Sequence, residues 1–304
     1  MVVATGFFDG VHLGHRHVIE TLVSAARERG TESVVVTFWP HPRNVLQNGA
    51  RGLRLLTTLQ EKKDILLSLG VSRVEVMSFT REFSRLSTEE YIRDVLIGRL
   101  GATAILLGYD NRIGCDAGTT DQIADQARRL GLEVIRTDSI ESAGVTVSST
   151  KIREALAAGE VDRAAQMLGY GYTLHGVVVE GNRLGRTIGF PTANMQMYEP
   201  LKLVPGGGVY AVRVSTLGRI FYGMTNIGTR PTVTGVSTGD ANSLKMRTVE
   251  TNIFDFDEDI YGLDIRIVFL RRIREERHFD SLEELRQQLV TDRAVCREII
   301  KNFR

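Results

Sequence analysis

The sequence predicts two domains of different class: a doubly wound α/β domain first, then an antiparallel β-barrel with a terminal helix. In the first half, short apolar runs alternate with amphipathic stretches, as strands and helices do in a parallel sheet with right-handed crossovers. In the second half, alternating segments lie between glycine and proline turns, and helical periodicity returns only at Ser281. A chain of 304 residues is long enough for two cores, and we expect domains at 1–168 and 169–304.

The elements of the first half follow from apolar spacing. Strands are expected at 2–5, 73–77, 104–107 and 133–135, and the β-branched run 33–38 suits a strand buried on both faces. Helices are expected at 15–29, 59–69, 88–100 and 122–130. In the first helix the apolar face consists of Val18, Ile19, Leu22 and Ala26.

In the second half, strands are expected at 173–179, 209–215, 220–225 and 263–270. Ser281 followed by Glu284 has the spacing of a capping box and predicts the start of the final helix. Its apolar face is expected to consist of Leu282, Leu285 and Leu289.

A glycine- and histidine-rich loop connects the first strand to the first helix. At the carboxyl end of a strand in an open α/β sheet, a helix N-terminus is a phosphate site. Gly6, Gly10 and Gly14 let backbone N–H groups approach a polyphosphate, and His12 and His15 would stabilise the charge that develops on phosphate. Two alternatives remain for the histidines: they could form half of a zinc site, or they could be ordinary residues at the start of a helix.

A second candidate phosphate site is the run Ser-Ser-Thr-Lys-Ile-Arg at 148–153. Hydroxyl groups followed by basic side chains at a helix N-terminus suit a phosphate clamp. A serine-rich helix cap without a ligand is the alternative, and the presence of the histidine loop favours the clamp.

The second half has its own candidate site. Thr192 and Asn194 lie two residues apart on an extended segment, so both side chains point the same way and can share one Mg²⁺. Glu250 lies on an expected strand before the acidic turn 255–257. Alone, residues 185–194 are read as a turn and Glu250 as a solvent-facing carboxylate.

The first half resembles the HxGH nucleotidyltransferases, which are Rossmann-like, and more closely the adenylyltransferase half of the bifunctional riboflavin kinase/FAD synthetases. The resemblance rests on residues 6–15, 37–42, 108–110 and 148–153. It implies that Asp110 lies next to FMN. It also implies that ATP is bound by Gly6, Asp9, His12, Gly14, His15, Ser148, Ser149, Thr150 and Arg153.

The second half resembles the riboflavin kinases, because residues 189–194 carry their Gly-Phe-Pro-Thr-Ala-Asn signature unchanged. The resemblance implies that Glu250 is the general base for the 5′-hydroxyl of riboflavin, and that Thr192 and Asn194 hold Mg–ATP. It further implies that the loop from Gly185 to Gly189 covers the phosphates.

Together these resemblances imply a bifunctional, Mg²⁺-dependent enzyme that converts riboflavin and ATP to FMN, then FMN and ATP to FAD and pyrophosphate. The sequence departs from the family at Asn111, Ile113 and residues 115–119. This leaves an alternative: a riboflavin kinase whose first domain is weak on FMN or uses another phosphorylated acceptor. A flavin-binding regulator is disfavoured, because a pure binder needs no base at position 250.

Composition limits the kinds of partner and the cellular location that we expect for this protein. With 38 basic against 37 acidic residues the formal net charge is +1, which gives no basic excess for nucleic acid. The apolar runs are too short to span a membrane, and no signal peptide precedes the first motif. Cys115 and Cys296 suggest neither a disulfide framework nor a metal site. We therefore expect small-molecule substrates and a cytoplasmic location, with the oligomeric state left open.

Overall fold

A computed structural model of the chain forms two compact units, Met1–Ser149 and Thr150–Arg304. The structure describes residues 1–46, 53–108, 112–116, 118–137, 141–142, 145–181, 184–229 and 247–303.

The first unit contains the expected parallel sheet, with five strands in the order β3-β2-β1-β4-β5. The strands are β1 (Val2–Thr5), β2 (Ser33–Trp39), β3 (Arg73–Ser78), β4 (Ala104–Leu107) and β5 (Glu133–Arg136). A short hairpin of β6 (Glu141–Ser142) and β7 (Val145–Thr146) follows. Because β1 pairs with both β2 and β4, the strand order reverses at β1, where such sheets bind their ligands.

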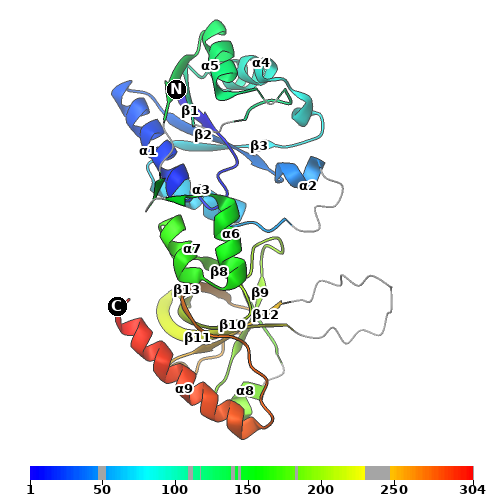
Figure 1. The fold of residues 1–304 in the computed structure, drawn as a ribbon, viewed down its shortest axis with the longest axis vertical. Helices are drawn as coiled ribbons and strands as arrows, with labels where there is room; N and C mark the ends of the chain where they lie inside the picture. Colours follow the sequence, from blue (N-terminus) through cyan, green and yellow to red (C-terminus); the bar gives the residue numbers. More distant parts are fainter. Residues whose placement is uncertain are drawn as a thin grey trace, which may run out of the picture. The chain divides into compact units, whose positions relative to one another are not determined.

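Helices cover both faces of this sheet (Figure 1), as a doubly wound fold requires. They are α1 (Leu13–Glu28), α2 (Pro42–Leu46), α3 (Leu59–Ser68), η1 (Phe83–Arg85), α4 (Thr88–Glu90), η2 (Tyr91–Arg99) and α5 (Thr120–Arg129). The single helix expected at 88–100 is a short α-helical turn that continues with π-helical hydrogen bonding.

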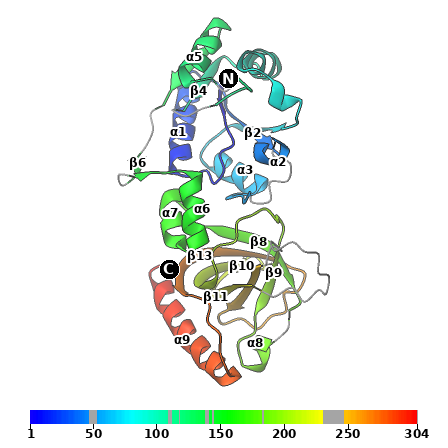
Figure 2. The same cartoon turned by 45° about the vertical axis from the view of Figure 1, so that its right-hand side comes forward.

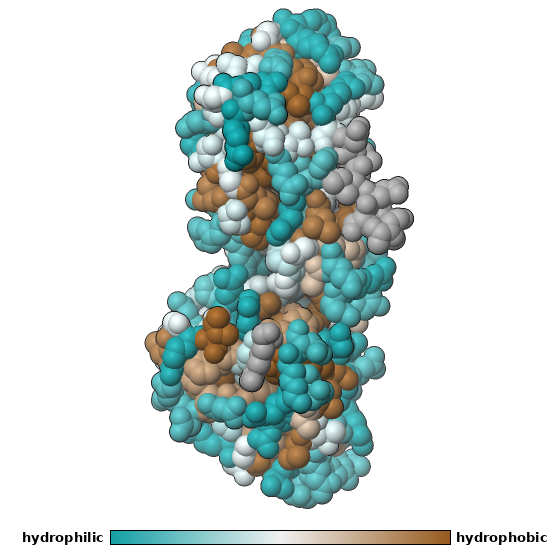
Figure 3. Space-filling model, turned by 90° about the vertical axis from the view of Figure 1, so that its left-hand side faces the viewer, coloured by the Kyte–Doolittle hydropathy of each residue, from teal (hydrophilic) through white to brown (hydrophobic). Residues whose placement is uncertain are grey.

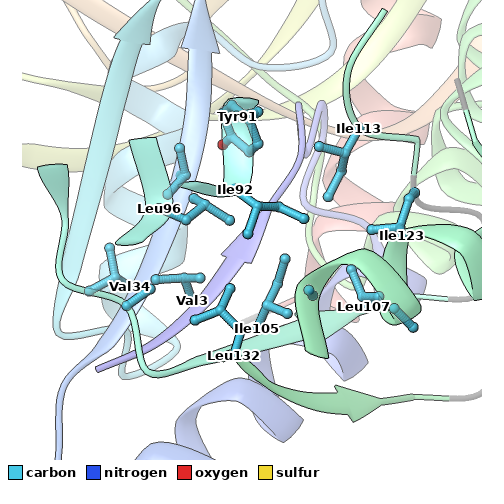
Figure 4. Close-up of a cluster of buried hydrophobic side chains, with 14 of the residues drawn as sticks. Val3, Val34, Tyr91, Ile92, Leu96, Ile105, Leu107, Ile113, Ile123 and Leu132 are labelled. Atoms are coloured by element: carbon cyan, nitrogen blue, oxygen red, sulfur yellow. The ribbon is translucent and has the colours of Figure 1, made fainter. Parts of the chain in front are cut away.

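Alternation along the strands divides the apolar residues between the two faces. Val3 packs in a cluster with Ile92, Leu96 and Ile123 (Figure 4), whereas Val2 packs in the opposite cluster, which α1 and α3 cover. In β2, the residues from Val34 to Val36 are all fully buried, which confirms the expectation of a strand buried on both faces.

The second unit is the expected antiparallel barrel, closed in the order β10-β11-β12-β9-β8-β13 (Figure 2). Its strands are β8 (Thr173–Val179), β9 (Ala193–Met197), β10 (Gly208–Thr216), β11 (Arg219–Thr229), β12 (Arg247–Ile253) and β13 (Asp264–Arg274). Neighbouring residues of β10 face opposite sides: Ala211 packs in the cluster that contains Cys296 of the last helix, and the Tyr210 ring stacks edge-on against Phe269.

The helices that accompany the barrel are α6 (Ser149–Ala158), α7 (Val161–Leu168), α8 (Leu184–Thr187) and α9 (Leu282–Lys301). The terminal helix α9 packs along β10, β11 and β13 (Figure 1). Its buried residues are Asp292, Cys296 and Ile300, at helical spacing.

Two details of α9 differ from the expectation. Leu282, expected on the apolar face, is 52% exposed, because the buried face of the helix begins only at Asp292. Ser281 caps the helix by accepting a hydrogen bond from the N–H of Glu284 at 3.2 Å. The carboxylate of Glu284 accepts from the N–H of Asp280, so the reciprocal half of the capping box is displaced by one residue.

On the face drawn in Figure 3, hydrophobic residues reach the surface of each unit in patches separated by hydrophilic ones. Among the helices of the described residues, none has the length and apolar character needed to cross a membrane.

Candidate active sites

The histidine loop leaves β1 at the point where the strand order reverses. The N–H of Gly6 still bonds to the carbonyl of Val36 at 3.0 Å, and the chain then turns sharply. Phe8, Gly10 and Val11 have φ values of 51°, 83° and 37°, in the left-handed region. A left-handed conformation is costly for phenylalanine and valine, and such strain gathers at binding and catalytic sites.

His12 and His15 are brought together as expected. His12 caps α1: its Nδ1 accepts a hydrogen bond from the backbone N–H of His15 at 3.3 Å. The two imidazole rings stack with centroids 3.7 Å apart. Since Nδ1 of His12 is an acceptor, the proton of its neutral ring is on Nε2, which makes Nε2 the nitrogen that donates.

His15 has a strongly perturbed environment. Burial lowers its pKa well below the usual value, and repulsion from His12, when that ring is protonated, and from Lys62 lowers it further. Its Nδ1 is buried and makes no hydrogen bond within the protein part that the structure describes. An imidazole that is neutral at pH 7, with an unsatisfied nitrogen in a cavity wall, is suited to contact a ligand.

These residues line a cavity of about 740 Å³, a size that suits a nucleotide-like ligand. The lining contains, from the predicted site, Gly6, His12, Gly14, His15, Ser148 and Ser149. The histidine loop and the serine run therefore meet in one cavity.

Aromatic side chains form another wall of this cavity, and sequence reasoning missed them. Phe38, Phe79, Phe83 and Tyr91 all line it, and their rings contact one another with centroids 5.7 to 6.4 Å apart. They come from the end of β2, the end of β3, η1 and η2, so only the fold assembles them. A flat aromatic ligand fits such a wall.

Asp9 faces away from the cavity. Its buried carboxylate accepts hydrogen bonds from the N–H groups of Leu56, at 3.0 and 3.1 Å, and Thr57, at 3.1 Å. Its own carbonyl accepts from the hydroxyl of Ser149 at 2.9 Å. This geometry gives Asp9 a part in holding the loop, whereas a direct nucleotide contact stays a prediction.

The segment in which the sequence departs from its relatives is partly described. Ile113, Gly114 and Cys115 line the cavity, and Ile113 is buried in the core cluster. Asp116 anchors the segment, because its carboxylate accepts from the N–H of Thr88 at 3.0 Å and from its hydroxyl at 2.6 Å. Asp110, the predicted FMN neighbour, lies outside the described residues.

A second cavity of about 330 Å³ lies in the barrel unit. Gly185, Thr192 and Glu250 line it together, although 65 residues separate the first from the last in sequence numbering (185 to 250). Asn194 on β9 is paired in register with Glu250 on β12. Asn194 itself does not line the cavity, and its amide lies against Gly181.

In the loop over this cavity, the backbone at Gly185 lies close to the backbone at Phe190. A Cβ on Gly185 would lie 2.2 Å from the carbonyl oxygen of Phe190, so glycine is required there. Asn252 holds the other side of the turn by donating to the carbonyl of Pro191 at 2.7 Å. Gly189 has a φ of 79° and open space around it, which fits a turn.

Sequence reasoning also missed Arg274, at the end of β13. It lines the second cavity, and its guanidinium group makes a two-pronged ion pair with the buried carboxylate of Asp292 on α9: Nε donates to Oδ1 at 3.0 Å and Nη2 to Oδ2 at 2.7 Å. Gln288 donates to the same carboxylate at 2.9 Å. The helix α9 therefore fixes an arginine in the cavity wall.

Comparison with known proteins gives matches over both units. A family model described as FAD synthetase matches residues 1–151, and one described as riboflavin kinase matches residues 168–300. Two curated relatives bear the name bifunctional riboflavin kinase/FMN adenylyltransferase. The protein of Bacillus subtilis is 35% identical over 100% of this chain and 93% of its own, and that of Listeria monocytogenes is 38% identical over 96% and 90%.

A solved structure described as a macrolide-efflux protein from Streptococcus pneumoniae is also similar. It has a TM-score of 0.88 and 32% identity, over 97% of this chain and 93% of its own.

Proposed function

Because this chain belongs to the bifunctional riboflavin kinase/FMN adenylyltransferase family, we propose that it makes FMN in the barrel unit and FAD in the α/β unit. The first reaction consumes riboflavin and ATP, and the second consumes FMN and another ATP and releases pyrophosphate. The single observation that best supports two separate reactions is that each unit has its own cavity, one beside His12 and His15 and the other beside Glu250.

In the α/β unit, the polyphosphate of ATP binds at the N-terminus of α1. Gly6 and Gly14 leave the backbone open to it, and the helix dipole favours its negative charge. A phosphate oxygen of FMN attacks the α-phosphorus of ATP, and pyrophosphate leaves. His12, through Nε2, and His15 stabilise the added negative charge, and Ser149 holds the loop through the Asp9 carbonyl.

Thr150 and Arg153, at the start of α6, are proposed to complete the ATP site. Asp110 keeps its proposed place beside FMN. The flavin ring is proposed to lie against the aromatic wall of Phe38, Phe79, Phe83 and Tyr91.

In the barrel unit, Glu250 takes the proton from the 5′-hydroxyl of riboflavin while that oxygen attacks the γ-phosphorus of ATP, and ADP leaves as the bond from the γ-phosphorus to the bridging oxygen breaks. Thr192 and Asn194 are proposed to hold Mg²⁺, which neutralises phosphate charge when bound. The residues fit this ion, because a hydroxyl and an amide oxygen are ligands that Mg²⁺ accepts, Thr192 lines the cavity with Glu250, and Asn194 is paired with Glu250 in register. Gly185 and Gly189 shape the loop proposed to cover the phosphates.

Three further proposals concern the whole chain. Residues 1–168 and 169–304 are the proposed functional domains, so that α6 and α7 belong to the first. Mg²⁺ is the proposed cofactor of both reactions. The cytoplasm is the proposed location, because it supplies the ATP that both reactions consume.

The proposal is tested by chromatography of a reaction that contains riboflavin, ATP and Mg²⁺. FMN is expected first and FAD later. FMN that accumulates without FAD would support instead a kinase whose α/β unit is weak on FMN or takes another phosphorylated acceptor.

Variants test the division between the units. Glu250→Gln is expected to lower FMN formation by roughly 10²- to 10⁴-fold, because it removes the base, while FAD synthesis from supplied FMN continues. His12→Ala combined with His15→Ala is expected to stop FAD synthesis and to spare the kinase. Equal loss of both activities in either variant would refute the division.

A further inference from the structure

A lysine lies buried behind the histidine loop. Lys62 on α3 is 1% exposed, and the N-cap of α3, Thr58, directly follows the two residues that bind the Asp9 carboxylate. Burying a lysine is costly unless its ammonium group finds partners, so its contacts indicate why it is there.

The contacts of Lys62 lead to the loop. Its Nζ donates to the carbonyl oxygen of Phe7 at 2.8 Å and to the hydroxyl of Thr37 at 3.1 Å. The hydroxyl of Thr37 donates to the same carbonyl at 3.2 Å. The ammonium group also lies 3.9 Å from the centre of the Phe7 ring. Phe7 directly precedes the left-handed turn that presents His12, so these contacts fix the start of that turn.

The charge of Lys62 also acts on the histidines. Burial lowers the pKa of Lys62 to about 8, although the attraction of the Asp9 carboxylate partly opposes this shift. The ammonium group is therefore mostly charged at pH 7. The groups whose positive charge lowers the pKa of His15 are His12, the N-cap of α1, when it is protonated, and Lys62 from α3. On the other sides, His41 packs edge-on against Phe7, and Arg112 lines the cavity.

We propose that Lys62 is a positioning residue for adenylyl transfer, which fixes the Phe7 carbonyl and places a positive charge behind the paired histidines. This inference rests on the proposed function of the α/β unit. The cation has two effects: it attracts the polyphosphate toward the loop, and it adds to the burial that keeps the imidazole of His15 neutral. Lys62 lies behind the loop, so it acts through Phe7 and His15 and does not itself touch the substrate.

Lys62→Met tests the proposal, because methionine fills a similar volume without the charge or the donors. We expect the kcat for FMN adenylylation to fall about 10- to 100-fold, as for a small misplacement of catalytic groups. We also expect the pKa of His15, measured by NMR titration of its imidazole Cε1–H resonance, to rise toward the usual value. Lys63→Met, at the next position of the same helix, is the matched control and is expected to change neither quantity.

Two further measurements keep the test decisive. Thr37→Val removes one partner of Lys62 but keeps its charge, so it is expected to lower kcat by a smaller factor and to leave the pKa of His15 unchanged. Riboflavin kinase activity and a dispersed imidazole spectrum verify that each variant is folded.

The proposal is overturned if Lys62→Met keeps kcat within about twofold of the unaltered enzyme, or if the pKa of His15 does not move. Combined His12→Ala and His15→Ala separates this failure from that of the proposed function. If the histidine variant loses FAD synthesis and Lys62→Met does not, only the role of Lys62 is wrong.

Discussion

Replacing Asp9 by asparagine distinguishes two roles for its carboxylate. If Asp9 holds the histidine loop, the variant loses stability and turnover together. If it contacts the nucleotide, as the family resemblance implies, the main effect is a higher KM for ATP with little change in unfolding temperature. The carboxylate is 4% exposed and accepts from the N–H groups of Leu56 and Thr57, so the first result is expected.

The size of the effect follows from these hydrogen bonds. Bonds to a charged acceptor contribute about 1.5–3 kcal/mol each, against about 0.5–1.5 kcal/mol for a neutral one. Losing the charge from two backbone bonds therefore costs about 2–3 kcal/mol. For a unit of this size, 1 kcal/mol changes the Tm by about 2–4 °C, so the α/β unit is expected to melt roughly 4–12 °C lower.

The assay combines thermal unfolding with separate rates of FMN and FAD formation. Asp64→Asn is the control, since Asp64 is an exposed carboxylate on α3 that accepts from Gln60. The reasoning is refuted if Asp9→Asn melts within about 1 °C of the unaltered protein while its KM for ATP rises.

Three other predictions concern single features. Gly185→Ala is expected to lower riboflavin kinase activity at least tenfold more than Gly189→Ala, because only the first places a Cβ against a carbonyl oxygen; both rates are measured with FMN formation. Phe83→Leu is expected to raise the KM for FMN about 3- to 10-fold and leave that for ATP unchanged, as the loss of one aromatic contact predicts. Since the pKa of Lys62 falls from 10.5 to about 8 on folding, the unfolded chain binds its proton more tightly. The free energy of unfolding of the α/β unit should therefore rise by about 3 kcal/mol as the pH increases from the folded to the unfolded pKa of Lys62. Denaturation of Lys62→Met at the same pH values should show no such rise.

Periodicity predicted the elements that carry the site. The β-branched run of β2 and the apolar stripe of α1 are local signals, and both were confirmed. The meeting of the histidine loop with Ser149 was predicted from two motifs and is seen as a shared cavity. The roles of the individual site residues stay predictions, because geometry alone does not show a bound substrate.

What the sequence did not reveal depends on contacts between distant segments. Asp9 lies within the histidine loop, but the partners of its carboxylate are 47 and 48 positions away in the chain. The aromatic wall is assembled from four segments. For Lys62 a signal existed: it lies three residues after Leu59 and four before Leu66, on the apolar stripe of its helix. A lysine on the apolar stripe of a helix indicates a buried ammonium group, and this pattern could have identified Lys62 from the sequence.

The two edges of the parallel sheet carry charge. On the edge strand β3, Arg73 pairs with Glu75, and on the edge strand β5, Glu133 pairs with Arg29 and Arg136 with Asp121. A foreign strand that docked there would have to desolvate these ion pairs. In the barrel, the six described strands close on themselves and leave no edge to extend. Edge-to-edge association of sheets from different copies is therefore disfavoured in both units, by charged edge strands in the first and by closure of the barrel in the second.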